Sequence, residues 1–163
     1  MNATSRVPDD LSSLGDPNRI RVVIITTGAG HHEPIPEDAL TINLADKLRN
    51  PPADPAVRDR LTNLTGLDKP VRDYVLSTPG ARQKVDQVYA QTHALLGWAA
   101  PHRRLVIVHL QCWGGRHRSV ALAEEIAAWL RADGIGVETE HRHINRPILP
   151  CRPRTDRPGG NRP

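Results

Sequence analysis

The feature that most constrains the fold of this chain is an aliphatic run that leads, through a glycine-rich segment, into a helical pattern. The run covers residues 105–110 and is interrupted only by His109. Short continuous apolar runs of this kind are typical of strands that are buried on both faces of a parallel sheet. Residues 118–132 then place apolar side chains at helical spacing, and Gly134 follows as a stop signal. A strand, a loop and a helix in this order indicate an α/β fold.

The remaining segments extend this pattern. Three more of them read as strands, at residues 22–25, 40–44 and 135–141. The helix at 118–132 therefore lies between two strands, which predicts a βαβ unit with a right-handed crossover. Other helices are expected after Asp54-Pro55, after Asp68-Lys69-Pro70 and over residues 81–97. We predict a single-domain α/β fold: a sheet with parallel βαβ units and flanking helices, and a glycine-rich anion-binding loop at a strand-to-helix junction.

The two ends of the chain differ in composition from its middle. Residues 1–18 are rich in Asn, Ser, Asp and Pro, and residues 148–163 are rich in Arg and Pro. Both segments are expected to be disordered. At 163 residues the chain suits one domain, which we place at residues 19–147.

Composition restricts the core, the compartment and the partners. The chain has no Phe and only two Tyr, so aliphatic side chains must fill the core. We find neither a signal-peptide pattern nor an apolar run of about 20 residues, which predicts a cytoplasmic protein with no membrane partner. Two cysteines cannot form a four-thiolate metal site, and no metal or cofactor is expected. The net charge of +4 fits either a solvated basic tail or attraction to the phosphates of nucleotides or RNA.

The segment between the clearest strand and its helix carries the candidate chemistry. It reads Cys112-Trp113-Gly114-Gly115-Arg116-His117-Arg118-Ser119. Backbone N–H groups and the dipole at a helix start attract anions, and arginine suits bidentate contacts with phosphate. Cations are unfavourable at that end of a helix unless an anion binds there. We therefore predict a phosphate-binding loop in which both guanidinium groups converge on the ligand, with Gly28 in a second loop lining the same cleft.

The same loop permits an enzymatic interpretation. Cys112, five intervening residues and then Arg118-Ser119 match the C-x5-R-S/T spacing of cysteine-dependent phosphatases. A cysteine at a helix start beside arginine would be a nucleophile, with Arg118 holding the phosphate oxygens. Such an enzyme also needs a general acid, and no aspartate in the sequence is marked for that role.

The loop also resembles a motif of a known family. Residues 112–120 are similar to the Cys-Thr-Gly-Gly-Lys-His-Arg-Ser-Val motif in the C-terminal domain of the RNase adapter family RapZ. Leu64-Thr65-Gly66-Leu67-Asp68-Lys69-Pro70-Val71 and Leu48-Arg49-Asn50-Pro51 resemble two further segments of that family, and His141-Arg142 falls where it has a His-Arg pair. Order and spacing agree across about residues 20–145.

The resemblance implies a domain that binds RNA and glucosamine-6-phosphate and that presents RNA to an endoribonuclease. Transferred by position, residues 112–119 form the ligand loop, with Asn43, Asn50, Thr65 and Gly66 around it. Arg116, His141 and Arg142 are the implied RNA contacts. Two positions depart from the family, because Trp113 replaces a threonine and Asn43 an aspartate. The relatives' N-terminal P-loop domain has no counterpart here, so a stand-alone version is expected.

We therefore predict a non-catalytic binding domain that senses a phosphorylated metabolite, binds RNA, or does both. Its expected partners are a phosphorylated small molecule and, through the resemblance, RNA and an endoribonuclease. A cysteine-dependent phosphatase is the main alternative, and an interaction module with a vestigial phosphate site is another. Assembly of several copies of the chain also stays open.

Overall fold

The computed structural model describes residues 19–99 and 104–150. Within them the elements are β1 (Ile20–Gly28), a short 3-10 helix η2 (Ala29–His31), β2 (Leu40–Asn43), α1 (Pro55–Asn63), α2 (Lys69–Ser77), α3 (Ala81–Ala99), β3 (Val106–Cys112), α4 (Arg118–Ala132) and β4 (Gly136–His141). The segments predicted to be disordered, residues 1–18 and most of the tail after residue 148, lie outside the described residues.

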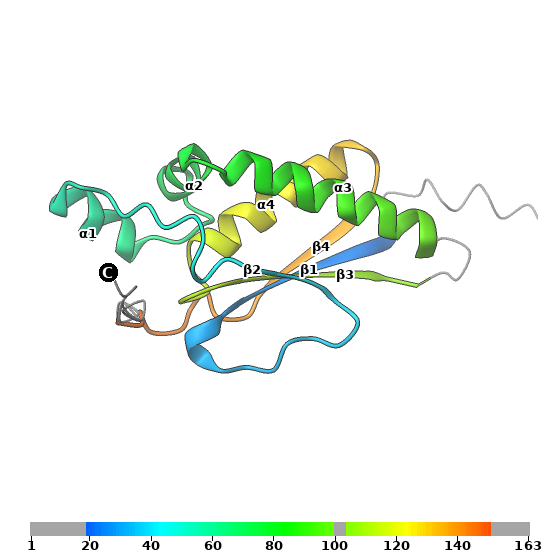
Figure 1. Ribbon diagram of the computed structural model, residues 1–163, viewed down its shortest axis with the longest axis horizontal. Helices are drawn as coiled ribbons and strands as arrows, with labels where there is room; N and C mark the ends of the chain where they lie inside the picture. Colours follow the sequence, from blue (N-terminus) through cyan, green and yellow to red (C-terminus); the bar gives the residue numbers. More distant parts are fainter. Residues whose placement is uncertain (1–18, 100–103, 151–163) are drawn as a thin grey trace, which may run out of the picture.

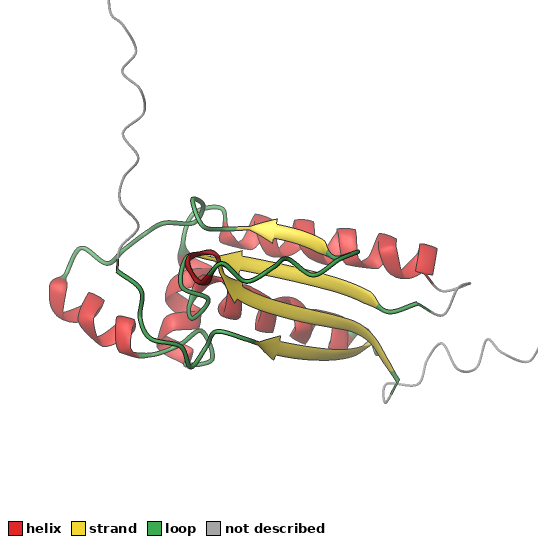
Figure 2. Ribbon diagram, turned by 90° about the horizontal axis from the view of Figure 1, so that it is seen from below, coloured by secondary structure: helices red, strands yellow, loops and turns green. Residues whose placement is uncertain are grey.

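The four strands form one parallel sheet in the order β2-β3-β1-β4 (Figure 2). The predicted α/β fold with a parallel sheet and flanking helices is therefore confirmed. The predicted unit β3-α4-β4 is also present, but β1 lies between its two strands and pairs with both. Because all strands run in the same direction, β1 and β3 end side by side, with Gly28 opposite Cys112.

The helices α2, α3 and α4 lie on one face of the sheet, and α1 extends beyond its carboxyl end (Figure 1). The core between these helices and the sheet is aliphatic, as the composition predicts. Strand residues such as Ile24, Val108 and Leu110 meet Leu122 and Ile126 of α4, all fully buried. This packing fixes the direction in which β3 enters α4, and so fixes the loop between them.

Helix boundaries follow local capping chemistry. The Asp54 carboxylate accepts a hydrogen bond from the backbone N–H of Ala56 at 2.8 Å, so it caps α1 as predicted. Asp68 precedes α2, but its carboxylate instead accepts from the backbone and hydroxyl of Thr65, at 2.7 and 3.0 Å. Gly134 ends α4 with a φ of 77°, as expected of a C-terminal glycine. Within the described ranges no helix is both long and apolar enough to span a membrane.

The other face of the sheet is crossed by residues 29–39 (Figure 2). Near the carboxyl ends of the strands it carries the polar side chains of Thr27, His109 and Gln111. His109 is fully buried there, and its Nε2 lies 2.8 Å from the hydroxyl of Thr27. The amide of Gln111 donates to the same hydroxyl at 3.3 Å. We call the two sides of the sheet the helix face and the open face.

Candidate anion-binding site

The loop that joins β3 to α4 packs against the end of β1 at backbone distance. Gly115 has a φ of 71°, in the left-handed region that favours glycine. A methyl group added there would lie 2.6 Å from the backbone nitrogen of Gly28, and one added at Gly28 would lie 2.6 Å from the carbonyl carbon of Gly114. Gly114 itself faces open space. Gly28 and Gly115 thus let two chain segments cross in backbone contact. Gly114 has no side chain and leaves the surface of the loop uncovered.

Unpaired backbone donors follow directly after this crossing. Among the described residues, no hydrogen bond is found that uses the N–H groups of residues 114–120 as donors. The N-cap position of α4 is occupied by His117, whose side chain makes no capping hydrogen bond. Ser119 lies inside the helix and is fully buried. Free amides and the positive end of the α4 dipole therefore meet at the loop, as an anion site requires.

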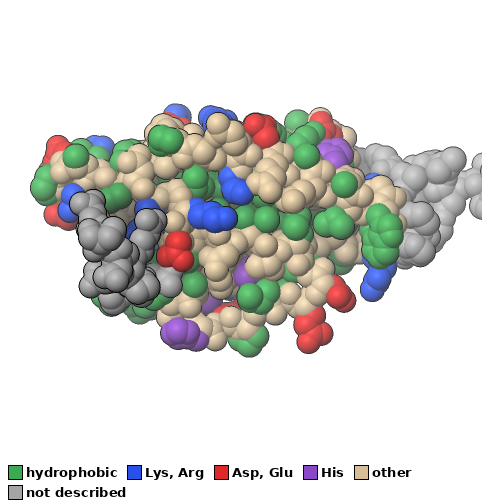
Figure 3. Space-filling model, viewed as in Figure 1, with side chains coloured by type: hydrophobic (Ala, Val, Ile, Leu, Met, Phe, Trp, Pro, Cys, Tyr) green, Lys and Arg blue, Asp and Glu red, His purple; other side chains and the backbone are tan. Residues whose placement is uncertain are grey.

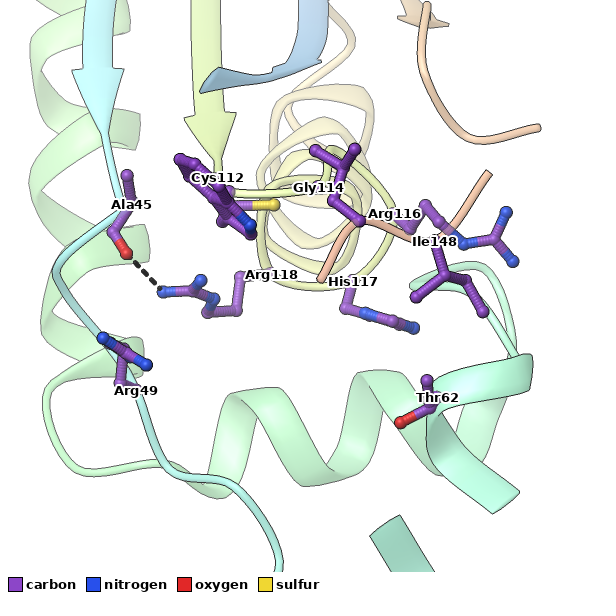
Figure 4. Close-up of a pocket in the computed structure, with 11 residues that line it drawn as sticks. Ala45, Arg49, Thr62, Cys112, Gly114, Arg116, His117, Arg118 and Ile148 are labelled. Atoms are coloured by element: carbon purple, nitrogen blue, oxygen red, sulfur yellow. Dashed lines mark hydrogen bonds between the residues drawn. The ribbon is translucent and has the colours of Figure 1, made fainter. Parts of the chain in front are cut away.

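A cavity of about 230 Å³ opens beside the loop (Figure 4). Six of its lining residues belong to the predicted ligand loop: Cys112, Trp113, Gly114, Arg116, His117 and Arg118. Five others come from elsewhere in the chain: Ala45, Arg49, Thr62, Ile148 and Leu149. Three of the described lining residues are arginines and none is an acid. The face drawn in Figure 3 carries Asp and Glu as well as Lys and Arg side chains over the half that holds α1, so the positive charge belongs to the lining of the cavity.

Arg118 lines the cavity and also holds the chain that follows β2. Its Nη1 donates to the carbonyls of Leu44 at 2.7 Å and Lys47 at 2.6 Å. A weaker bond to the carbonyl of Ala45, at 3.4 Å, is the dashed line in Figure 4. Burial is the main reason that the pKa of Arg118 falls below its ordinary value, and the side chain remains a cation at neutral pH. Leu48, next to these carbonyls, has a φ of 55°, so this anchored segment is strained.

Arg116 points away from Arg118. Its Nη1 donates to the carbonyls of Ile144 at 2.6 Å and Arg146 at 3.1 Å, while its buried Nε has no hydrogen-bond partner among the described residues. Figure 4 shows the two guanidinium groups on opposite sides of the loop. The expected convergence of both arginines is therefore not observed, because each one stabilises a different neighbouring segment.

His117 and Cys112 complete the wall at the helix start. The Nε2 of His117 donates to the carbonyl of Leu64 at 2.8 Å, and burial is the main cause that lowers the pKa of this imidazole. It is therefore a neutral donor near pH 7. The Cys112 Sγ lies 3.2 Å from the Ser119 hydroxyl, and both groups are buried.

Several residues expected around the ligand lie behind the loop or beside it. Gly66 packs under the start of α4, where an added methyl group would lie 2.5 Å from the carbonyl oxygen of His117. The Asn43 side chain accepts a hydrogen bond from the backbone of Ala45 at 2.8 Å, and Thr65 is bonded to Asp68. Asn50 is exposed. None of these, nor Gly28, Gly115 or Ser119, lines the cavity.

The residues predicted to contact RNA are engaged within the protein. His141 lies between the hydroxyl of Thr26, at 2.9 Å, and the carboxylate of Glu124, at 3.0 Å. Arg142 donates to Glu33 at 2.9 Å and to Glu140 at 3.0 Å. Both therefore stabilise the end of β4, and neither lines the cavity.

A second polar cluster supports the glycine loop from the open face. His143 is fully buried, its Nδ1 accepts from the backbone N–H of Gly28 at 2.8 Å, and its Nε2 donates to Glu33 at 2.6 Å. Burial tends to raise the pKa of Glu33, but the hydrogen bonds from Arg142 and His143 lower it overall. No group of His, Cys, Asp and Glu able to hold a metal ion is found in residues 19–99 and 104–150.

Sequence reasoning missed five lining residues for identifiable reasons. Arg49 and Ala45 follow β2, whose carboxyl end lies at the same edge of the sheet as that of β3, so their position could have been inferred from a parallel sheet. Thr62 comes from α1, and nothing in its surroundings marks it. Ile148 and Leu149 belong to the segment predicted to be a tail, yet Trp113 Nε1 donates to the carbonyl of Pro150 at 2.9 Å and holds this stretch in place.

A parallel sheet with a glycine-rich strand-to-helix loop and a basic cavity at its carboxyl edge defines the class: a small α/β ligand-binding domain. The family model described as the RapZ C-terminal domain matches residues 21–145. The chain therefore belongs to the RapZ C-terminal domain family, as its loop motif suggests.

Curated relatives agree with this assignment. A nucleotide-binding protein of Parafrankia sp. (strain EAN1pec) is 37% identical over 136 residues, covering 83% of this chain and 46% of the relative. Similar proteins with the same descriptive name occur in Thermobifida fusca (strain YX), 37% identical over 78% of this chain and 42% of the relative, and in Bifidobacterium longum (strain NCC 2705), 40% identical over 80% and 38%. The chain spans less than half the length of these relatives.

Proposed function

We propose that this domain binds the phosphate group of a small molecule at residues 112–119 and holds it without reacting with it. The observation that carries the proposal is the run of unpaired backbone N–H groups at residues 114–120, placed at the positive end of α4. Arg49 and Arg118 add positive charge on the same side of the cavity. The name nucleotide-binding protein borne by the relatives is consistent with a ligand that contains phosphate.

The first test is a thermal-shift screen against inorganic phosphate, sugar phosphates and nucleotides. Glucosamine-6-phosphate belongs in the screen because the family resemblance implies it. A ligand at 100 times its dissociation constant should stabilise the protein by about 2.7 kcal/mol. The proposal fails if no phosphate compound in the screen raises the melting temperature.

Two matched pairs of variants locate the site. Arg49→Ala removes an exposed cation at the cavity, whereas Arg104→Ala removes one before β3, at the opposite end of that strand. Gly115→Ala places a methyl group against the Gly28 backbone, whereas Gly97→Ala places one in open space on α3. Titration calorimetry with inorganic phosphate should show weaker binding for Arg49→Ala and Gly115→Ala than for their controls. Equal affinities in both pairs would place the site elsewhere.

RNA binding and presentation of RNA to an endoribonuclease are part of the proposal only through the family resemblance. The positions that would contact RNA in this chain, Arg116, His141 and Arg142, bond to carbonyl and carboxylate groups of the protein itself. Any RNA contact would therefore use the basic surface around the cavity, and its affinity should fall steeply with salt. A retardation assay that detects no complex at low salt would remove RNA from the proposal.

One observation favours the phosphatase alternative. The Cys112 Sγ lies within 3.2 Å of the Ser119 hydroxyl at the wall of the cavity, in the same loop as Arg118. However, none of the described residues that line the cavity is an acid able to protonate a leaving group. Burst hydrolysis of p-nitrophenyl phosphate that disappears in Cys112→Ser would establish this alternative and overturn the non-reacting site.

A further inference from the structure

The backbone crossing of Gly28 and Gly115 is supported by a side chain that does not line the cavity. His143 follows β4 and is fully buried, and its Nδ1 accepts a hydrogen bond from the Gly28 N–H at 2.8 Å. A methyl group added at Gly115 would lie 2.6 Å from that same nitrogen and 2.9 Å from the Cβ of His143. The imidazole, the Gly28 peptide group and Gly115 are therefore packed together where the ligand loop meets β1.

The two hydrogen bonds of His143 define its protonation state. A backbone N–H can only donate, so Nδ1 must present a lone pair to Gly28, and the imidazole must be neutral with its proton on Nε2. That Nε2–H donates to one carboxylate oxygen of Glu33 at 2.6 Å. The other oxygen of Glu33 accepts from Arg142 at 2.9 Å, which holds the carboxylate in place. Glu33 thus orients the ring whose opposite nitrogen holds Gly28.

The turn that carries His143 is also bonded to the ligand loop directly. The Arg116 Nη1 donates to the carbonyls of Ile144 at 2.6 Å and Arg146 at 3.1 Å. The backbone N–H of Arg146 in turn donates to the carbonyl of His143 at 3.1 Å. The position of the loop therefore depends on this turn through two separate sets of bonds.

We propose that Glu33 and His143 are positioning residues of the anion site: the carboxylate orients the neutral imidazole, and the imidazole holds Gly28 where Gly115 packs against it. The inference rests on the proposed phosphate site and identifies what keeps its loop in place. Without the bond to Nδ1, the peptide group of Gly28 is free to rotate. The loop that contacts it then loses the fixed geometry that an anion site needs.

Protonation of His143 is incompatible with this arrangement. An imidazolium carries an N–H at both ring nitrogens, so Nδ1 could no longer accept from Gly28. Proton uptake at Nδ1 and the bond from Gly28 therefore exclude each other. The charged or titratable groups around the ring are His31 and Glu33 before β2, His109 of β3, Arg116 of the ligand loop, and Arg142 and Arg146 of its own turn.

Glu33→Ala is the first test, because the Glu33 side chain is 26% exposed and its replacement leaves the core intact. Titration calorimetry with inorganic phosphate at pH 7.5 should show about tenfold weaker binding, as expected when a buried donor loses its fixed partner. Glu140→Ala is the matched control. It removes the same charge and also a bond to Arg142, at 3.0 Å, but none of the described bonds of Glu140 reaches His143. This control should keep the affinity of the unchanged protein.

His143→Asn and His143→Leu separate hydrogen bonding from packing. The asparagine side-chain oxygen can replace Nδ1 as the acceptor for Gly28, whereas leucine fills the space without accepting. His143→Leu should bind phosphate about tenfold more weakly, and His143→Asn should recover most of that loss.

The pH dependence adds a result that packing alone would not give. Asparagine does not titrate, so the affinity of His143→Asn relative to the unchanged protein should rise severalfold between pH 7.5 and pH 5.5. The ionisation of phosphate cancels in this ratio, because both proteins meet the same ligand.

The outcomes separate this inference from the proposed function. If the unchanged protein binds phosphate and Glu33→Ala binds it equally well, the positioning role is wrong while the phosphate site stands. The same holds if His143→Asn binds as weakly as His143→Leu, or if its relative affinity does not rise on acidification. If a His143 variant does not fold, the comparison of Glu33→Ala with Glu140→Ala decides. If the unchanged protein binds no phosphate, the proposed function itself fails.

Discussion

The helix face and the open face of the sheet are built from the same strands but are stabilised in different ways. On β3, Val108 and Leu110 point toward the helices, and His109 and Gln111 point to the opposite side. The first pair is buried by aliphatic packing that many side chains of similar volume could supply. The second pair depends on hydrogen bonds from particular partners, above all Thr27. The comparison predicts different responses to substitution on the two faces.

The largest effect is expected on the helix face. Leu110→Ala removes a fully buried side chain and leaves a cavity, which should lower the free energy of unfolding by about 3 kcal/mol. Urea denaturation measures this change. Leu105→Ala, at a side chain that is 55% exposed, is the control and should cost well under half as much. Equal losses would show that the helix face is not the main source of stability.

A smaller effect is expected from two neighbouring threonines that face opposite sides. Thr27→Val leaves His109 and Gln111 without the hydroxyl that both contact, and should cost about 2 kcal/mol. Thr26→Val on the helix face removes one contact to His141, which keeps its bond to Glu124, and should cost about 1 kcal/mol. Thermal and urea unfolding of both variants checks the order. A reversed order would contradict the assigned importance of the open-face hydrogen bonds.

The histidines whose pKa is lowered by burial should make stability depend on pH near neutrality, and His109 on the open face is one of them. Burial and, secondarily, the charge of Arg142 lower the pKa of His109 below its ordinary value of about 6.5. The unfolded chain therefore takes up a proton before the folded protein does, and stability is lost as pH falls below about 6.5. Burial lowers the pKa of His31 and His117 in the same way and adds to the loss.

The measurement compares urea midpoints at pH 7.5 and pH 5.5. His109→Leu should show a smaller decrease on acidification than the unchanged protein, by at most about 1.4 kcal/mol per pH unit. Leu110→Ala should retain the full decrease, because it leaves His31, His109 and His117 in place. A decrease in His109→Leu that equals that of the unchanged protein would remove His109 as a source of the pH dependence.

The smallest effect is expected where the open face reaches solvent. Glu138 of β4 is exposed, so Glu138→Gln should change the free energy of unfolding by no more than about 0.5 kcal/mol. A larger change in urea denaturation would mean that this edge of the open face takes part in interactions like those around His109.

The helix face could be predicted from sequence because its signals are local. Aliphatic runs gave the strands, and Asp54 before Pro55 gave the start of α1. The order of the strands was less accessible, since the insertion of β1 between β3 and β4 depends on contacts between distant segments. The hydrogen bond between His109 and Thr27 could not be predicted for the same reason, because it joins residues that are 82 positions apart.

The candidate site could be predicted only in part, because its loop has a local signal but its other contacts join distant segments. Residues 113–117 form a loop at the expected strand-to-helix junction, and Gly115 makes the close crossing with Gly28 that only glycine allows. The directions of Arg116 and Arg118 could not be inferred, because they are set by carbonyls of segments that approach only in the folded chain. Ile148 and Leu149 were missed as lining residues because they stand in a segment whose composition resembles a tail.

The bonds of Arg118 to the carbonyls of Leu44 and Lys47 couple the loop to the stretch after β2. If a bound anion pulls the Arg118 guanidinium toward itself, the carbonyls of Leu44 and Lys47 must accept hydrogen bonds from water instead. The strained turn at Leu48 then loses the restraint that these two bonds provide. By thermodynamic reciprocity, anything that immobilises residues 44–48 in their present position makes the arginine less available to an anion, and by the same factor. Anion binding at the start of α4 and the ordering of residues 44–48 are thus governed by the same equilibrium.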